Sequence, residues 1–345
     1  MNISYSQPLS DAWRRMKFFL FQPFDLGRWF VLGFTAWLAE LAGGYSGGAS
    51  EKFRVTEDLD GDTFGDWAFT ATDRIKDFFE NPWVFLLAGM LLAGALMIWV
   101  LILWISSRGR FMFLDNLVHR RTEVKAPWSG FAAQGDSLFL WQVAYSLIVL
   151  IVMGFLVVGS LLMFFPVMAL ELPLAATLPL AILMGTLVFI LVVAMVYIEF
   201  FLTQFVVPIM YRERIPATAA WKLFGSLFRA HPGEFFLFGL IYFGVMLCGW
   251  FLYLAGGLLT CCLGLVLLAL PYLGTVLTLP MLTLGRYFSL DFLGQFGDQY
   301  RLLEPVPAVP EHPYGSTEIH RDGTVVGPED IGQDAGGGEP GPEDS

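Results

Sequence analysis

The sequence predicts an all-α, polytopic membrane protein with about six transmembrane helices. Of its 345 residues, 56% are hydrophobic and only 15% are charged, whereas a typical soluble domain is about 25% charged. Asp, Glu, Lys and Arg are all missing from three long segments, 137–170, 172–198 and 235–285. Because a helix needs about 20 apolar residues to cross a bilayer, the first two segments hold one crossing each and the third holds two.

Two shorter apolar segments, 29–41 and 82–105, complete the six predicted crossings. Lys and Arg gather in every second connection. They are Arg14, Arg15, Lys17, Arg28, Arg108, Arg110, Arg120, Arg121, Lys125, Arg212, Arg214, Lys222 and Arg229. Connections rich in Lys and Arg stay in the cytoplasm. We therefore expect a multi-pass protein of the cell (inner or plasma) membrane with both termini in the cytoplasm.

The first crossing has a second interpretation, because the small residues of "ELAGGYSGGAS" at 40–50 follow it. Such a pattern could mark a secretory signal with a cleavage site. The basic segment ahead of the apolar run is unusually long for a signal, however, and cleavage would remove one of six consistent crossings. We expect an uncleaved first helix.

Residues 9–21 predict a helix that lies at the cytoplasmic membrane interface. Its apolar side chains share one side, while Arg14, Arg15 and Lys17 fall elsewhere. An apolar face opposite basic residues is typical of interfacial helices. Pro23 should end this helix, and the Asp25 side chain should cap the next one.

A similar pattern returns at 219–240 and, more weakly, at 126–141. We therefore predict three units, about 1–111, 112–211 and 212–300, each with an interfacial helix followed by a helical hairpin. The alternative is convergence, since Trp and bases gather at any cytoplasmic interface. True repetition requires Trp13 and Trp221 to lie in similar environments. The expected interfacial anchors are Trp13, Arg14, Arg15, Trp128, Trp221 and Lys222.

Two acidic segments are expected outside the membrane. The extracytoplasmic loop 45–81 contains "EDLDGDTFGD", but Thr63 and Phe69 occupy the positions where a calcium-binding EF-hand needs Gly and Glu. We expect a solvated loop, with weak cation binding by its acids as the alternative. Segment 301–345 is rich in Pro, Gly and acids, which predicts a disordered cytoplasmic tail.

Ionisable residues inside a membrane are costly and often functional. Glu199 and Arg286 lie near the inner ends of the fourth and sixth predicted crossings, so we expect an intramembrane pair that stabilises the bundle. A proton or substrate relay is the alternative. Pro271 and Pro280 are candidate helix breaks in the sixth crossing, and broken helices line substrate sites in some transporters.

Two segments carry a family resemblance, "LSDAWRRMKFFLFQPFDLGRWFVLGF" and "FVVPIMYRERIPATAAWKLF". They resemble a broad set of uncharacterised bacterial and archaeal integral membrane proteins. That set includes the membrane-embedded region of some glycerophosphodiester phosphodiesterases. The resemblance covers about 1–300 and implies a membrane module. The phosphodiesterase domain has no counterpart, because no segment is long enough for a soluble α/β-barrel.

The sequence predicts no catalytic set, metal site or cofactor. His119 and His231 lie in predicted surface segments, without a ligand spacing typical of metal sites. We expect a non-enzymatic membrane module that organises lipids or partner membrane proteins, because aromatic and basic surface helices suit anionic headgroups. No nucleic-acid partner is expected. The alternative is a transporter or channel for a small or lipid-like solute.

Overall fold

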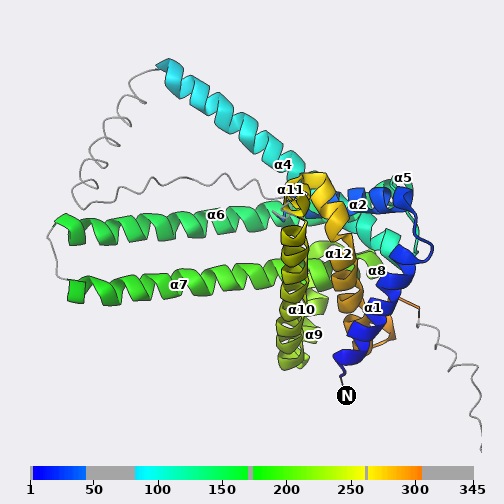
Figure 1. Ribbon diagram of the computed structural model, residues 1–345. Helices are drawn as coiled ribbons and strands as arrows, with labels where there is room; N and C mark the ends of the chain where they lie inside the picture. The colour runs from blue at the N-terminus through cyan, green and yellow to red at the C-terminus, as the bar shows by residue number, and fades with distance from the viewer. Residues whose placement is uncertain (1–2, 44–81, 170–173, 261–262, 305–345) are drawn as a thin grey trace, which may run out of the picture. The chain divides into compact units, whose positions relative to one another are not determined.

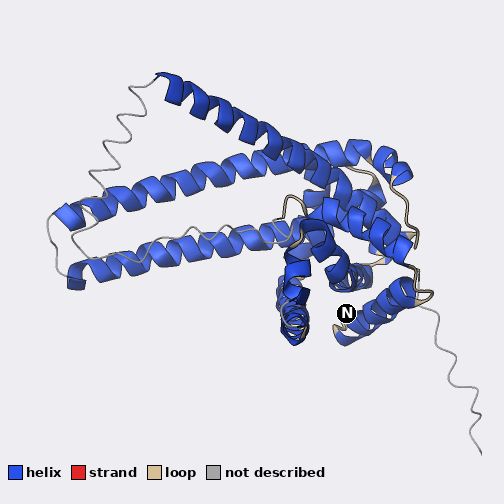
Figure 2. Cartoon of the chain, turned by 45° about the horizontal axis from the view of Figure 1, so that its top comes forward, coloured by secondary structure: helices blue, strands red, loops and turns tan. Residues whose placement is uncertain are grey.

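The computed structural model describes residues 3–43, 82–169, 174–260 and 263–304, all within one unit, Met1–Glu304 (Figure 1). Every regular element in these residues is helical (Figure 2), so the all-α prediction is confirmed for the described part of the chain. The predictions for the acidic loop 45–81, and for the tail beyond Glu304, lie outside the described residues.

The described α-helices range from 6 to 38 residues in length. They are α1 (Ser6–Phe21), α2 (Leu26–Glu40), α4 (Pro82–Val118), α5 (Lys125–Gly130), α6 (Ala132–Ala169), α7 (Leu174–Phe201), the π-helix η1 (Leu202–Val206), α8 (Val207–Glu213), α9 (Ala217–Ala230), α10 (Pro232–Leu259), α11 (Leu263–Ala269) and α12 (Pro271–Leu293). Two 3₁₀ turns follow, Gly294–Phe296 and Asp298–Tyr300.

Four helices of the described residues are long and apolar enough to cross a membrane: 82–118, 132–160, 178–213 and 232–259. The two further crossings are not confirmed. Helix α2 has 15 residues, about 22 Å at 1.5 Å per residue, which is short against a hydrocarbon core of about 30 Å. The sixth predicted crossing is divided at Leu270, where an extended residue separates α11 from α12.

Helix α2 begins with the Asp25 cap that the sequence predicts. Asp25 Oδ1 accepts hydrogen bonds from the backbone N–H groups of Gly27 and Arg28, at 2.8 and 3.4 Å. This carboxylate therefore satisfies two of the N–H groups that a helix leaves unpaired at its first turn. The predicted cap is confirmed, and α1 ends at Phe21, ahead of Pro23.

The shorter helices pack against neighbours that precede or follow them in the chain. Helix α5 contacts α4, α9 contacts α8, and α1, which no long helix precedes, contacts α12. Helix α2 packs between α4 and α12. The order of contacts therefore closes on itself, with the first helix of the unit joined to the last.

Helix α1 does not keep its apolar face free for the membrane interface. Its buried residues include Ala12, Met16 and Leu20, and the helix packs along α12. At its start, the ring of Tyr5 stacks on Phe292 with centroids 5.8 Å apart. The helix was predicted correctly, but its apolar face is covered mainly by protein.

Trp13 and Trp221 lie in unlike environments. Trp13 is 55% exposed on α1, whereas Trp221 on α9 is half-buried and stacks on Trp141 with ring centroids 5.3 Å apart. The predicted equivalence of these two residues is therefore wrong. The indole N–H of Trp221 is buried without a hydrogen-bond partner, so this ring serves packing.

Candidate functional site

An ion pair between one buried and one partly exposed side chain joins α4 to α7. Arg110 Nη2 donates to Glu199 Oε1 at 2.6 Å, and Arg110 Nη1 donates to Thr203 Oγ1 at 3.2 Å. The Arg110 side chain is 4% exposed and that of Glu199 is 38% exposed. The Gln142 amide of α6, oriented with its oxygen toward Arg110, accepts from both terminal nitrogens at 3.1 Å. The guanidinium is thus surrounded by acceptors, as a buried charge requires.

The partner predicted for Glu199 was wrong. Arg286 of α12 is buried, at 3% exposure, and its Nη1 donates to the backbone carbonyl of Thr203. Among the described ion pairs, the cation that binds Glu199 is Arg110. Both arginines therefore converge on Thr203, which lies in the π-helix η1, where the regular α-helical ladder is interrupted. The Thr203 hydroxyl accepts a hydrogen bond from Arg110 of α4, and the Thr203 carbonyl accepts one from Arg286 of α12.

Gln204, the next residue of η1, extends these contacts to α10. Its Nε2 donates to Tyr242 Oη at 2.9 Å, and its Oε1 accepts from Ser289 Oγ at 2.8 Å. The π-helix therefore links α4, α10 and α12 through two consecutive side chains. We call this set the buried polar layer. Ser107 joins the set because, with the Gln142 oxygen toward Arg110, the Ser107 hydroxyl accepts from the amide nitrogen of Gln142 at 2.6 Å. The layer comprises Ser107, Arg110, Gln142, Glu199, Thr203, Gln204, Tyr242, Arg286 and Ser289.

A repeated heptapeptide, which the sequence analysis missed, positions both arginines. "GRFMFLD" at 109–115 and "GRYFSLD" at 285–291 share Gly, Arg, Leu and Asp at the same spacing. A Cβ on Gly109 would lie 2.6 Å from the backbone of Leu38 in α2, and a Cβ on Gly285 would lie 2.7 Å from Tyr242 Oη in α10. Each glycine lets a neighbouring helix approach closely, and the arginine that follows enters the buried polar layer.

The aspartate at the end of each heptapeptide binds an arginine. The arginine on Asp115 comes from the connection that follows α4, and the arginine on Asp291 comes from α1. Asp115 is buried and accepts from Arg121 Nη2 at 2.6 Å and from Tyr211 Oη at 2.8 Å. The hydrogen bond to Asp115 raises the pKa of Arg121. Asp291 accepts from Arg15 Nε at 3.2 Å. These two ion pairs fasten the ends of α4 and α12.

Arg15 is therefore not an interfacial anchor. It is buried, and its Nη2 also donates to the carbonyl of Glu304 at 2.5 Å. Burial raises the pKa of Asp291 to about 6, although the Arg15 charge acts in the opposite direction. The amphipathic pattern of α1 predicted that Arg15 points away from the apolar face. In the structure α12 packs beside α1 and supplies Asp291 as a partner for the Arg15 charge.

The other predicted anchors have separate surroundings. Arg14 pairs with Asp11 at 2.5 Å on the exposed side of α1. The Trp128 ring lies 5.3 Å from the Arg108 guanidinium, which is bound by Asp136. Lys222 is exposed on α9. The part of the chain that the structure describes brings no three His, Cys, Asp or Glu side chains together in a metal-binding group.

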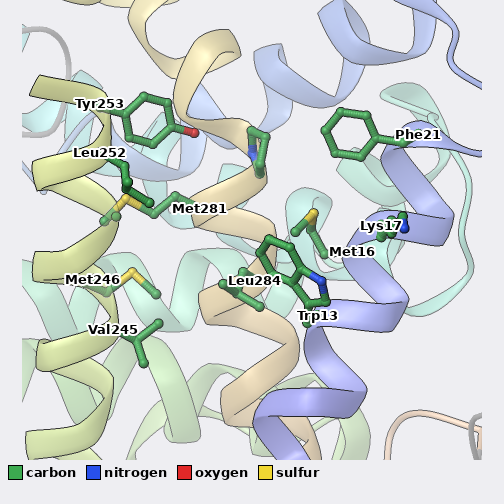
Figure 3. A pocket seen from close by; sticks show the side chains of 12 residues that line it. Trp13, Met16, Lys17, Phe21, Val245, Met246, Leu252, Tyr253, Met281 and Leu284 are labelled. Carbon is green, nitrogen blue, oxygen red and sulfur yellow. The ribbon is translucent and has the colours of Figure 1, made fainter. Parts of the chain in front are cut away.

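An apolar groove lies between α1, α10 and α12, with a cavity volume of about 550 Å³ (Figure 3). Figure 3 shows Trp13 and Met16 of α1 opposite Val245 and Met246 of α10, with Leu284 of α12 between them. We call it the α1–α10–α12 groove. Its lining residues are Trp13, Met16, Lys17, Phe21, Val245, Met246, Gly249, Leu252, Tyr253, Pro280, Met281 and Leu284.

The two prolines predicted as breaks behave differently. Pro271 is the first residue of α12 and directly follows the extended residue Leu270. Pro280 lies inside the continuous helix α12, so a break there is wrong. A proline disturbs the hydrogen bonds of the preceding turn, and Tyr253 Oη donates to the Leu277 carbonyl in that turn at 3.1 Å.

Comparison with known proteins identifies a family and no described activity. No curated protein and no solved structure matches the chain. The similarity to the membrane region of glycerophosphodiester phosphodiesterases stays a prediction. The model of one family of unknown function matches residues 5–282, which include the buried polar layer except its last two members and all but one residue of the α1–α10–α12 groove. The chain therefore belongs to the family of unknown function DUF7544.

Proposed function

We propose that this protein is a non-enzymatic, multi-pass protein of the cell membrane that organises membrane lipids. The observation that carries the proposal is the exposure of its apolar helices. The apolar windows of α6 and of α7–α8 have none of their residues buried, and those of α4 and α10 have few. Exposed apolar surface of this extent is costly in water, whereas lipid chains would cover it in a bilayer.

We further propose that the chain crosses the membrane six times. The heptapeptides at 109–115 and 285–291 relate α4 to α12 alone, and the unlike surroundings of Trp13 and Trp221 count against three related units. The short helix α2 would cross as a partner of α4 and α12, which cover its polar groups.

Site-directed labelling tests the number of crossings. We would replace the native cysteines, place a single cysteine at Ser10, Ser50 or Ser226, and label intact cells with a membrane-impermeant maleimide. Six crossings predict labelling at position 50 alone, with positions 10 and 226 reached only after the membrane is opened. Protection of position 50 together with position 10 would show that α2 does not cross.

Lipid analysis tests the proposed function itself. The full chain, purified in a mild detergent and passed over a sizing column, should retain membrane lipid that mass spectrometry of the intact protein detects. A preparation that is folded, embedded in membranes before extraction and free of retained lipid would contradict a lipid-organising role. Partner membrane proteins that copurify in place of lipid would shift the role toward protein assembly.

A transporter of a small or lipid-like solute is the second candidate, and Glu199 favours it. A partly exposed carboxylate on an apolar helix beside a π-helix is a functional hypothesis by default. Reconstituted vesicles with a fluorescent phospholipid would show accelerated flipping if the solute is lipid-like, and Glu199→Gln would abolish it. Flipping no faster than in protein-free vesicles would count against lipid transport.

A further inference from the structure

We propose that the α1–α10–α12 groove binds one hydrocarbon chain of an acidic phospholipid, whose headgroup phosphate contacts Lys17. This inference rests on the proposed lipid-organising function and names the ligand and its site. The groove combines a long apolar wall with one cationic side chain, Lys17. That combination matches a molecule with a hydrocarbon chain and an anionic end.

The shape and chemistry of the wall suit a flexible chain. Its volume of about 550 Å³ falls within the range of about 300–1,000 Å³ typical of small-molecule sites. Met16, Met246 and Met281 line it, and methionine side chains adapt to irregular apolar partners. At Gly249 the absence of a side chain leaves room for the Met281 side chain in the wall, because a Cβ there would lie only 3.1 Å from Met281 Sδ.

The position of the groove favours lipid over other occupants. Helix α10, which forms one wall, is among the candidate membrane spans, so hydrocarbon is the medium expected beside it. Segment 305–345 of this chain is rich in Pro, Gly and acids, with few large apolar residues. It therefore does not match an apolar wall. A second copy of the chain remains an outcome that the experiment below detects.

The charge at the groove supplies the preference for an acidic headgroup. Arg14 pairs with Asp11 and Arg15 with Asp291. Lys17, the third base of α1, is exposed and has no ion-pair partner among the described residues. It is thus the base of α1 that is left for an anion from outside the protein. Trp13, on the same helix, adds an aromatic ring of the kind enriched at membrane interfaces.

Titration of the purified full chain tests the site. The probes are phosphatidylglycerol and phosphatidylcholine of equal chain length, and mass spectrometry of the intact protein counts bound lipids. We expect wild type to bind phosphatidylglycerol more tightly. Lys17→Gln should weaken phosphatidylglycerol binding about fivefold and leave phosphatidylcholine binding unchanged. Gly249→Leu should weaken the binding of both lipids. If the leucine side chain disturbs folding, the smaller change Gly249→Ala replaces it and should weaken the binding of both lipids to a lesser extent.

Two matched controls separate the groove from general effects. Lys222 is an exposed lysine of α9 that does not line the groove, and Gly244 is a glycine of α10 whose Cβ would meet nothing within 4 Å. Lys222→Gln and Gly244→Leu should therefore behave as wild type. Equal binding of both lipids by wild type would overturn the headgroup assignment. A dimer lost in Gly249→Leu would show that a second copy fills the groove.

The same measurements distinguish this inference from the proposed function. Wild type that binds neither lipid would contradict both. Wild type that binds lipid, with unchanged affinity in Lys17→Gln, Gly249→Ala and Gly249→Leu, would overturn the groove while leaving the lipid-organising role in place.

Discussion

At the scale of single residues, the Arg110–Glu199 ion pair is expected to be structural. Removing one partner leaves the other charge without compensation. Arg110→Gln should therefore destabilise the protein by about 2–3 kcal/mol, below the fully buried range because Glu199 is partly exposed. The double variant with Glu199→Gln should recover part of this loss in thermal unfolding measured in detergent. Arg14→Gln, at an exposed pair, is the control and should cost below about 1 kcal/mol.

A purely functional role for Glu199 would give another pattern. Glu199→Gln would then leave the unfolding temperature unchanged, both when it is introduced into wild type and when it is introduced into Arg110→Gln. Additive losses would also contradict the pair, because residues in direct contact are expected to couple.

Asp291 provides a pH prediction. Its pKa is about 6 in the folded protein, against an ordinary value of 3.8, so the folded state binds this proton more tightly than the unfolded state does. Between about pH 4 and pH 6 the stability contributed by the protonated carboxyl should fall as pH rises, by at most about 1.4 kcal/mol per unit. Asp291→Asn cannot titrate. Its unfolding temperature should therefore decline less than that of wild type across this interval; parallel pH profiles would refute the assignment.

At the scale of helices, the close approach of α2 to α4 depends on Gly109. A Cβ there would lie 2.6 Å from the carbonyl carbon of Leu38 and 2.7 Å from the backbone nitrogen of Ala39, and backbone atoms cannot move aside as a flexible side chain does. Gly109→Ala should therefore destabilise by about 1–3 kcal/mol. Gly94→Ala, in the same helix with nothing within 4 Å of its Cβ, should be neutral or slightly stabilising. Equal unfolding temperatures for the two variants would contradict the close packing.

Helices could be predicted from the sequence more surely than the partners of their faces. The periodicity of 9–21 predicted α1, and Asp25 predicted the start of α2, because both signals are local. The same periodicity suits a membrane interface and a neighbouring helix equally, so it did not reveal that α12 covers α1. Glu199 pairs with Arg110 and not with the predicted Arg286; both arginines lie near the ends of apolar runs. Only the fold decides which of them reaches it.

At the scale of the whole molecule, the repeated heptapeptide was the signal that could have predicted more. It predicts that Arg110 and Arg286 share a role, and both do converge on η1. The tryptophans at predicted surfaces are a weaker signal of repetition, because composition there is set by the membrane rather than by a partner helix. The closed order of packing, in which α1 rests on α12, joins elements nearly the full chain apart, and no local pattern reports such a contact.

This closure gives a prediction for the intact protein. The backbone N–H of Ser4 donates to Gln295 Oε1, and Gln295 Nε2 donates back to the Ser4 carbonyl, both at 2.9 Å. In a variant without native cysteines, Ser4→Cys and Gln295→Cys should therefore be joined by a short bifunctional maleimide in native membranes, within one chain and independently of expression level. Ser10→Cys with Gln295→Cys is the control and should react poorly, because Ser10 lies along α1, away from this contact. A product between two chains, or equal reaction of both pairs, would show that α1 is not held on its own α12. The chain's first helix would then be free to lie in the membrane interface, as its amphipathic sequence alone predicts.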